Sequence, residues 1–281
     1  MNYIETLKTA AKKFNSIVCM GLDPVIEDIP LQGKPGGIIE KFYLDILNEI
    51  IQKKIYPGAV KPNYAFYAQY GLQGIEALMS IISIYSREGI PVILDVKRGD
   101  IGKTAEAYAI EAFDFFKADA VTLSPYMGYD SISPFMKRKP DGGFYILTKT
   151  SNKSSGDIQD IVAGEKPLFM HTAEKIIQWY SPGIGSVVGA TYPEQLAEVS
   201  SLFNNSGKEI PLLIPGVGSQ GGDLQSVVDE LKKSPDIMIH RINSSSALNY
   251  AYKKNTDVNY AAAAVQALHD LNNQINRLSG A

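Results

Sequence analysis

Short apolar runs recur along this chain of 281 residues, and consecutive runs are separated by enough residues for a helix or a loop. Runs of four or five residues are too short for buried helices and are typical of parallel strands covered on both faces. Eight strands alternating with helices predict a (β/α)8 barrel, formed by one domain over residues 1–281, whose usual size is about 250 residues. A doubly wound open sheet is the alternative. The runs are Ile17–Gly21, Gly58–Lys61, Val92–Asp95, Ala120–Leu123, Phe144–Leu147, Ser186–Gly189, Leu212–Pro215 and Ile237–Arg241.

Helices are predicted between the runs, at 37–53, 74–88, 103–117, 131–136, 167–180, 192–202 and 222–233. Two further helices are expected at the ends of the chain, at about 3–14 and 258–278. The polar segment 151–165 is the most loop-like part, and it is long enough to form a functional loop over a site.

Composition narrows the class of protein. A net charge of −3 and a pI of about 5.7 give no general attraction to nucleic acid or anionic membranes. No apolar run approaches a span of about 18 residues, and the amino terminus lacks the pattern of a signal peptide, so we expect a cytoplasmic protein. The single cysteine, Cys19, is predicted to be a core residue. His171, His240 and His269 lack metal-ligand spacing and are predicted to be structural or surface residues.

A carboxylate and an ammonium group stand at the end of the third apolar run. Asp95 and Lys97 are two residues apart, so in a strand their side chains point to the same face. Such a pair in a dry interior is costly to maintain. It is therefore either a structural ion pair or part of a reaction site, and its place at the carboxyl end of a strand favours the second.

Other polar residues follow strand ends and have simpler explanations when taken alone. Asp23 precedes a proline and fits a turn, while Lys61 could reach solvent at the rim of the barrel. Asp100 could cap a helix beginning near Ile101, and Thr104 could be a solvated helix residue. A barrel gathers its strand ends at one mouth, however, and this favours a shared site.

A glycine-rich segment follows the seventh run. Its Gly216, Gly218 and Gly221 fit the dinucleotide-binding pattern, but too little chain follows for a nucleotide-binding domain. A loop that binds phosphate through backbone N–H groups is the better prediction. Arg241 ends the eighth run and is predicted to bind the same phosphate with its planar guanidinium, the alternative being a surface arginine.

Together these segments resemble the orotidine 5′-phosphate decarboxylase family, in its longer bacterial form (the type 2 subfamily). The Asp-x-Lys-x-x-Asp core is shared with sugar-phosphate relatives, but together with Lys61 and the glycine-rich loop it is specific to this family. The resemblance covers about residues 15–250. The matching segments are Gly21-Leu-Asp-Pro24, Val60-Lys-Pro-Asn-Tyr-Ala-Phe-Tyr67, Asp95-Val-Lys-Arg-Gly-Asp100, Ile101-Gly-Lys-Thr104 and Pro215-Gly-Val-Gly-Ser-Gln-Gly-Gly222.

The resemblance implies a lyase that decarboxylates orotidine 5′-monophosphate to uridine 5′-monophosphate, the last step of de novo pyrimidine nucleotide synthesis, without a metal or cofactor. It implies that Lys97 stabilises charge at C6 of the pyrimidine and delivers the proton there. Asp95 would face the departing carboxylate, and Lys61 would belong to the charged network.

The same resemblance implies how substrate is held. Asp23 and Lys61 would contact ribose hydroxyls and Ser151 the pyrimidine amide. The phosphate would be bound by Gly218, Gln220 and Arg241. The family's members are homodimers with shared sites, so Asp100 and Thr104 would act in the site of the neighbouring subunit.

Three alternative functions stay open. A metal-dependent sugar-phosphate aldolase or decarboxylase would carry an acidic metal ligand where Lys61 stands, and lysine repels a cation. A Schiff-base aldolase could use Lys61 or Lys97 as its nucleophile. A catalytically silent nucleotide binder would have little use for the intact set of charges.

Overall fold

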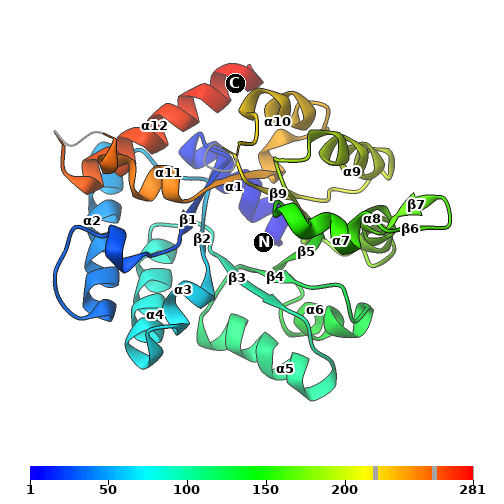
Figure 1. The fold of residues 1–281 in the computed structure, drawn as a ribbon, viewed down its shortest axis with the longest axis horizontal. Helices are drawn as coiled ribbons and strands as arrows, with labels where there is room; N and C mark the ends of the chain where they lie inside the picture. The colour runs from blue at the N-terminus through cyan, green and yellow to red at the C-terminus, as the bar shows by residue number, and fades with distance from the viewer. Residues whose placement is uncertain (218–220, 255–257, 281) are drawn as a thin grey trace.

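The computed structural model describes residues 1–217, 221–254 and 258–280. Eight parallel strands form one sheet in the order β2-β1-β10-β9-β8-β5-β4-β3 (Figure 1). Parallel bridges from Val60 to Val92 and from Asn63 to Asp95 join β2 to β3, so the sheet closes on itself. The predicted barrel is confirmed, and the open sheet is wrong. The strands are β1 (Val18–Leu22), β2 (Ala59–Pro62), β3 (Ile93–Arg98), β4 (Ala120–Leu123), β5 (Gly143–Lys149), β8 (Ile184–Val188), β9 (Leu212–Pro215) and β10 (Arg241–Ser244).

Helices surround the barrel on the outside (Figure 1). The predicted helix at 103–117 consists of an α-helix followed by a π-helical turn at Glu111–Phe115. The other predicted helices form close to their expected ends. The helices around the barrel are α2 (Pro35–Lys53), α3 (Tyr64–Ala68), α4 (Gly71–Arg87), α5 (Gly102–Ile110), α6 (Ser133–Arg138), α8 (Leu168–Gln178), α9 (Pro193–Asn205), α10 (Leu224–Leu231), α11 (Ser246–Asn249) and α12 (Tyr260–Ser279). No helix within the described ranges is long and apolar enough to cross a membrane.

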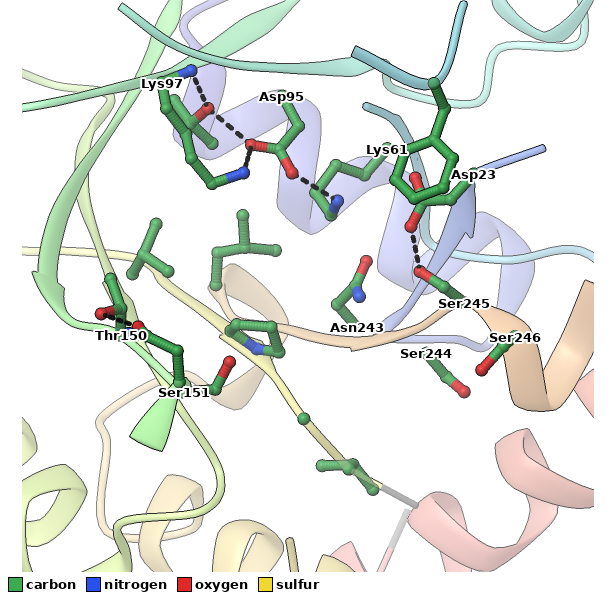
Figure 2. Close-up of a pocket in the computed structure, with 18 of the residues that line it drawn as sticks. Asp23, Lys61, Asp95, Lys97, Thr150, Ser151, Asn243, Ser244, Ser245 and Ser246 are labelled. Atoms are coloured by element: carbon green, nitrogen blue, oxygen red, sulfur yellow. Dashed lines mark hydrogen bonds and ion pairs between the residues drawn. The ribbon is translucent and has the colours of Figure 1, made fainter. Parts of the chain in front are cut away.

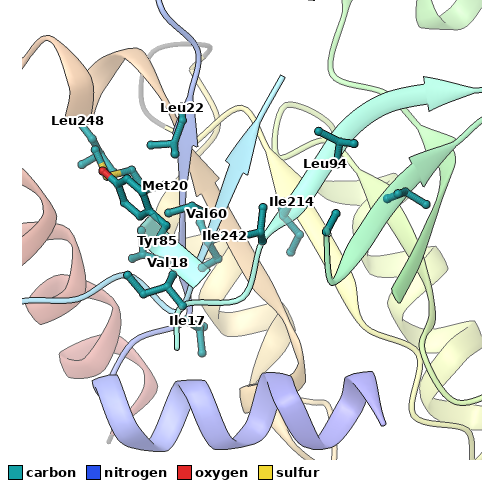
Figure 3. Packing of buried hydrophobic residues seen from close by; sticks show 14 of the residues in the cluster. Ile17, Val18, Met20, Leu22, Val60, Tyr85, Leu94, Ile214, Ile242 and Leu248 are labelled. Atoms are coloured by element: carbon teal, nitrogen blue, oxygen red, sulfur yellow. The ribbon is translucent and has the colours of Figure 1, made fainter. Parts of the chain in front are cut away.

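Successive side chains of each strand point alternately toward the helices and into the barrel, and both environments are apolar, so the runs are apolar throughout. Val18, Met20 and Leu22 of β1 belong to the cluster between strands and helices (Figure 3). Cys19 belongs to the cluster inside the barrel. Both faces of the strand are therefore buried. Cys19 is a core residue as predicted, and burial raises the pKa of its thiol to about 12.

Helix α1 (Tyr3–Phe14) lies across the amino ends of the strands (Figure 3). A capping box between Asn2 and Glu5 fixes its first turn. Tyr3 and Leu7 are buried against the interior cluster of the barrel, and the Tyr3 hydroxyl donates to that of Tyr145. The amino end of the barrel is thus filled by side chains.

The eighth strand is the main correction to the predicted elements. Residues Ile237–Ile239 form a 3-10 helix, whose first turn is capped by the Asp236 side chain, and β10 begins at Arg241 rather than ending there. The sequence of β10 is largely polar, because its carboxyl end faces a site. A prediction from hydrophobicity therefore placed the strand at the preceding apolar residues, Ile237–Ile239.

The segment 151–165 is more regular than predicted. It contains a 3-10 turn at Lys153–Ser155, the short helix α7 (Gly156–Gln159) and β6 (Val162–Ala163), which pairs antiparallel with β7 (Lys166–Pro167). This hairpin projects from the side of the barrel (Figure 1).

Candidate active site

A pocket of about 540 Å³ lies at the carboxyl ends of the barrel strands (Figure 2). Five residues predicted from sequence line it, and they come from four strands or the loops after them. Neighbouring lining residues come from β9, β10 and the loops that follow these two strands. The five predicted residues are Asp23, Lys61, Asp95, Lys97 and Ser151.

Two lysines contact one carboxylate in this pocket. Lys61 Nζ donates to Asp95 Oδ2 at 2.8 Å, and Lys97 Nζ donates to Asp95 Oδ1 at 2.6 Å. The side chains of Lys61 and Asp95 are each 7% exposed, whereas that of Lys97 is 47% exposed. Lys61 is therefore enclosed behind the carboxylate, and the Lys97 ammonium remains accessible from the pocket.

Thr122 of β4 completes the environment of the carboxylate. Its hydroxyl donates to Asp95 Oδ1 at 2.8 Å and accepts the backbone N–H of Lys97 at 2.9 Å. Lys97 has a φ of 46°, in the left-handed region, where β3 departs from regular register with β4. Such a backbone persists when its neighbours hold it, and here the Thr122 hydroxyl does so.

The charges in the pocket are mutually stabilised. Burial alone raises the pKa of Asp95, but the attraction of Lys61 and Lys97 outweighs it and holds the pKa well below its ordinary value. Burial alone lowers the pKa of Lys61, but Asp95, assisted by Asp23, raises it above its ordinary value. At neutral pH the buried carboxylate and the buried ammonium are therefore both charged.

The other end of the pocket is formed by β1 and β10. Asp23 Oδ2 accepts a hydrogen bond from the Ser245 hydroxyl at 2.7 Å. Gly21 makes this approach possible, because a Cβ there would lie 1.8 Å from Ser245 Oγ. Asp23 Oδ1 and Asn243 Oδ1 are buried with no hydrogen-bond partner among the described residues, so both can accept from a ligand.

The structure contradicts the predicted place of Arg241. This residue begins β10, so it lies at the opposite end of the barrel from the pocket, and it is fully buried. Its guanidinium donates to the carbonyls of Gly58, Met238, His240 and Leu7 at 2.7–3.1 Å. Arg241 therefore joins the start of β2, α1 and the turn before β10, and it does not bind the phosphate.

The remaining predicted residues lie elsewhere. Asp100 and Thr104 do not line the pocket, and Thr104 is exposed. Asp100 does not cap α5, which begins at Gly102, although its carboxylate accepts the N–H of Ile101 at 2.8 Å. The predictions for Gly218 and Gln220 fall outside the described residues.

Several lining residues were missed by the sequence analysis. Thr122 stands inside an apolar run and gave no signal. The small polar residues after Arg241 were not predicted to line the pocket, because the eighth strand was expected to end at that arginine. The residues concerned are Thr122, Thr150, Asn152, Asn243, Ser244, Ser245, Ser246 and Tyr250.

No group of three or more His, Cys, Asp or Glu side chains placed to hold a metal ion occurs in the described part of the chain. The histidines fit their predicted structural or surface places. His240 is buried below the barrel, where its Nδ1 accepts the N–H of Leu212 at 3.0 Å. His171 is partly exposed, and its Nε2 lies 2.8 Å from the carbonyl oxygen of Ala163.

Comparisons with known proteins agree with this geometry. The model of the orotidine 5'-phosphate decarboxylase / HUMPS family matches residues 16–274. Orotidine 5'-phosphate decarboxylases of Janthinobacterium sp. (strain Marseille) and Dechloromonas aromatica (strain RCB) are each 40% identical to this chain, over 98–99% of its length and 99% of theirs. The solved structure of Leishmania donovani OMP decarboxylase is 34% identical, covers both chains completely and superposes with a TM-score of 0.81. This chain therefore belongs to the orotidine 5'-phosphate decarboxylase / HUMPS family.

Proposed function

We propose that this enzyme decarboxylates orotidine 5′-monophosphate to uridine 5′-monophosphate, the last step of de novo pyrimidine nucleotide synthesis. The observation that carries the proposal is the set of contacts between Lys61, Asp95 and Lys97, which places a fixed anion beside an accessible ammonium in the pocket. The family membership of the chain supports the same reaction.

The proposed chemistry follows from these charges. The bond between C6 and the carboxylate breaks, CO₂ leaves, and the electron pair stays on C6. The Lys97 ammonium lies in a preorganised position to stabilise this charge and then to donate its proton to C6. Asp95 would lie beside the substrate carboxylate, and departure of CO₂ would relieve that repulsion. Lys61 keeps Asp95 ionised throughout.

The rest of the nucleotide would lie along the remaining lining residues. Asp23 and Lys61 offer an acceptor and a donor for ribose hydroxyls, and Ser151 would contact the pyrimidine amide. Phosphate sites of such barrels lie in the loops after the seventh and eighth strands, here β9 and β10. The described residues of these loops that line the pocket, such as Gly216 and Ser246, provide hydroxyl and backbone N–H donors. Gly218 and Gln220 stay predicted contributors.

We also propose a homodimer in which Asp100 and Thr104 act in the site of the second copy. Exposed apolar side chains near them, Ile101 at 48%, Tyr126 at 85% and Met127 at 46%, support a covered surface there. Mixing the variants Lys97→Ala and Asp100→Asn tests this, because a hybrid dimer regains one complete site. Mixtures no more active than either variant would contradict shared sites.

A cytoplasmic location, and a lack of nucleic-acid and membrane partners, stay predictions from composition and the amino terminus.

The direct experiment follows the ultraviolet absorbance of orotidine 5′-monophosphate with purified protein, with and without EDTA. Rapid loss of substrate that is indifferent to the chelator is expected. Activity abolished by EDTA would favour the metal-dependent sugar-phosphate enzymes, and no turnover by folded protein would favour a nucleotide binder.

A further inference from the structure

A buried ammonium lies behind the pocket and has no part in the proposed chemistry. Lys149, the last residue of β5, is fully buried, and its Nζ donates to Asp160 Oδ1 at 2.6 Å. The same Nζ lies 4.5 Å from the ring centre of Tyr192 and 5.9 Å from that of Phe169. The charge is thus held by one carboxylate and two aromatic rings.

An irregularity in the sheet accounts for the direction of this side chain. In a regular strand Leu147 and Lys149 would face the same side. The register between β5 and β8 shifts between these two residues, so that Leu147 lines the pocket and Lys149 does not. Bulges commonly redirect a side chain in this way next to active sites. Here the bulge directs Lys149 toward α7 and α8.

The partner of Lys149 is linked to the rim of the pocket. Asp160 directly follows Gln159, the last residue of α7. The Gln159 amide oxygen accepts the backbone N–H of Thr150 at 2.9 Å, and its amide nitrogen donates to the Thr150 hydroxyl at 2.8 Å. Thr150 lines the pocket together with Ser151 and Asn152. The Lys149 side chain is fully buried and that of Asp160 is 46% exposed. Asp160 is therefore the immediate chain neighbour of the residue whose hydrogen bonds hold this rim.

The loop after β8 supports the same rim from its other side. The Thr191 hydroxyl donates to the carbonyl of Ser151 at 3.2 Å, and the Tyr192 hydroxyl donates to the carbonyl of Asn152 at 3.0 Å. Tyr192 therefore contacts both the Lys149 ammonium and the rim.

We propose that Lys149 is a positioning residue for substrate binding, which acts through Asp160 and Gln159 on Thr150, Ser151 and Asn152. A buried ammonium is costly without a counter-charge, so Lys149 holds Asp160 against the barrel and thereby fixes the end of α7. Gln159 then sets the position of the rim over the ligand. Neither Lys149 nor Asp160 lines the pocket, and neither has a described hydrogen bond to Asp95 or Lys97, so the ion pair affects binding rather than the chemical step. This inference rests on the decarboxylase function proposed above.

The test compares two charge-neutralising changes in one segment. Asp160→Asn removes the counter-charge, and Asp157→Asn is the matched control, because Asp157 is exposed on the same helix and has no described contact of this kind. Asp160→Asn is expected to raise the KM for orotidine 5′-monophosphate and the Kd for uridine 5′-monophosphate about tenfold, with kcat within about twofold of wild type. Asp157→Asn is expected to change neither KM nor Kd. Asp160→Glu keeps the carboxylate, and its KM and Kd are expected to lie closer to the wild-type values.

A second variant keeps the inference testable if Asp160→Asn does not fold. Gln159→Leu leaves the ion pair intact but removes both hydrogen bonds to Thr150, and it is expected to raise KM in the same way. Wild-type turnover together with equal KM values for Asp160→Asn and Asp157→Asn would overturn the positioning role alone. A loss confined to kcat in Asp160→Asn would also overturn the positioning role. Wild-type protein that neither binds uridine 5′-monophosphate nor consumes the substrate would overturn both proposals.

Discussion

At the scale of single residues, Lys61 and Lys97 share one carboxylate but differ in what they can reach. The side chain of Lys61 is 7% exposed, and its ammonium is enclosed behind Asp95, whereas that of Lys97 is 47% exposed beside the pocket. A proton donor must contact the atom that it protonates. Lys97 fits that task, and Lys61 fits the task of keeping Asp95 charged.

Lys97→Ala is therefore expected to abolish most turnover while nucleotide binding persists. Loss of a positioned proton donor costs about 10²–10⁴-fold in rate, so kcat should fall by about 10³-fold. Steady-state kinetics and titration with uridine 5′-monophosphate measure the two effects. Lys137→Ala, at an exposed lysine of α6, is the control. A variant with more than about a tenth of wild-type activity would remove Lys97 from the proton-donor role.

Substitution of Arg241 is expected to lower the stability of the protein and to leave its affinity for phosphate unchanged. Arg241→Met would leave three buried carbonyls and one part-buried carbonyl without their charged donor, so the free energy of unfolding should fall by about 3–5 kcal/mol. Denaturant unfolding measures this loss. The ratio of affinities for uridine 5′-monophosphate and uridine should stay unchanged in protein that is folded. Selective weakening of the phosphorylated ligand, with normal stability, would return Arg241 to the phosphate site.

At the scale of elements, the ends of β5 and β8 meet closely beside the pocket. A Cβ at Gly189 would lie 2.7 Å from Ser151 Cα and 2.9 Å from Ser151 N. These are backbone atoms, and they cannot move without displacing the rim formed by Thr150, Ser151 and Asn152.

Gly189→Ala is expected to lower the free energy of unfolding by about 1–3 kcal/mol and to raise the KM for substrate. Gly37→Ala is the control, because Gly37 lies in α2 with nothing within 4 Å of a built Cβ. That change should raise stability by about 0.5–1 kcal/mol through helix propensity. Thermal unfolding and steady-state kinetics of both variants check this pair. Wild-type stability and KM in Gly189→Ala would contradict this prediction, because they would show that the backbone of the rim can shift to accommodate the added Cβ.

At the scale of the whole molecule, the two ends of the barrel have different tasks. The carboxyl end holds the charged pocket, and the amino end is filled by α1, Arg241 and His240. Burial, with a contribution from Arg241, lowers the pKa of His240 to about 3, so this imidazole is neutral in the folded protein at neutral pH.

This buried histidine predicts acid sensitivity. The unfolded chain protonates His240 below about pH 6.5, whereas the folded chain does so near pH 3, so stability from this residue is present above pH 6.5 and is lost as the pH falls. Between pH 7 and pH 5 the loss should be about 2 kcal/mol. Asp95 contributes little in this range, since its stabilising effect declines only below its ordinary pKa of about 4. Denaturant unfolding at both pH values, in wild type and His240→Asn, measures the difference. An equal pH dependence in the two proteins would contradict it.

The barrel and four charged residues at its mouth could be predicted from local sequence patterns. Apolar runs and helical spacing are local properties, and they predicted seven of the eight strands close to their positions, with Asp23, Lys61, Asp95 and Lys97 at the mouth. The eighth strand was misplaced because its own residues are polar, and the error carried Arg241 to the wrong end of the barrel.

Contacts that depend on strand register could not be predicted before the folded sheet was known. The hydroxyl of Thr122 reaches Asp95 because β3 lies beside β4, and Lys149 turns away from the pocket because β5 shifts register against β8. Asn243 and Ser245 reach the pocket because β10 begins at Arg241. The positions of these side chains depend on how strands far apart in the chain pair with one another as the sheet closes. The local sequence pattern does not contain this information.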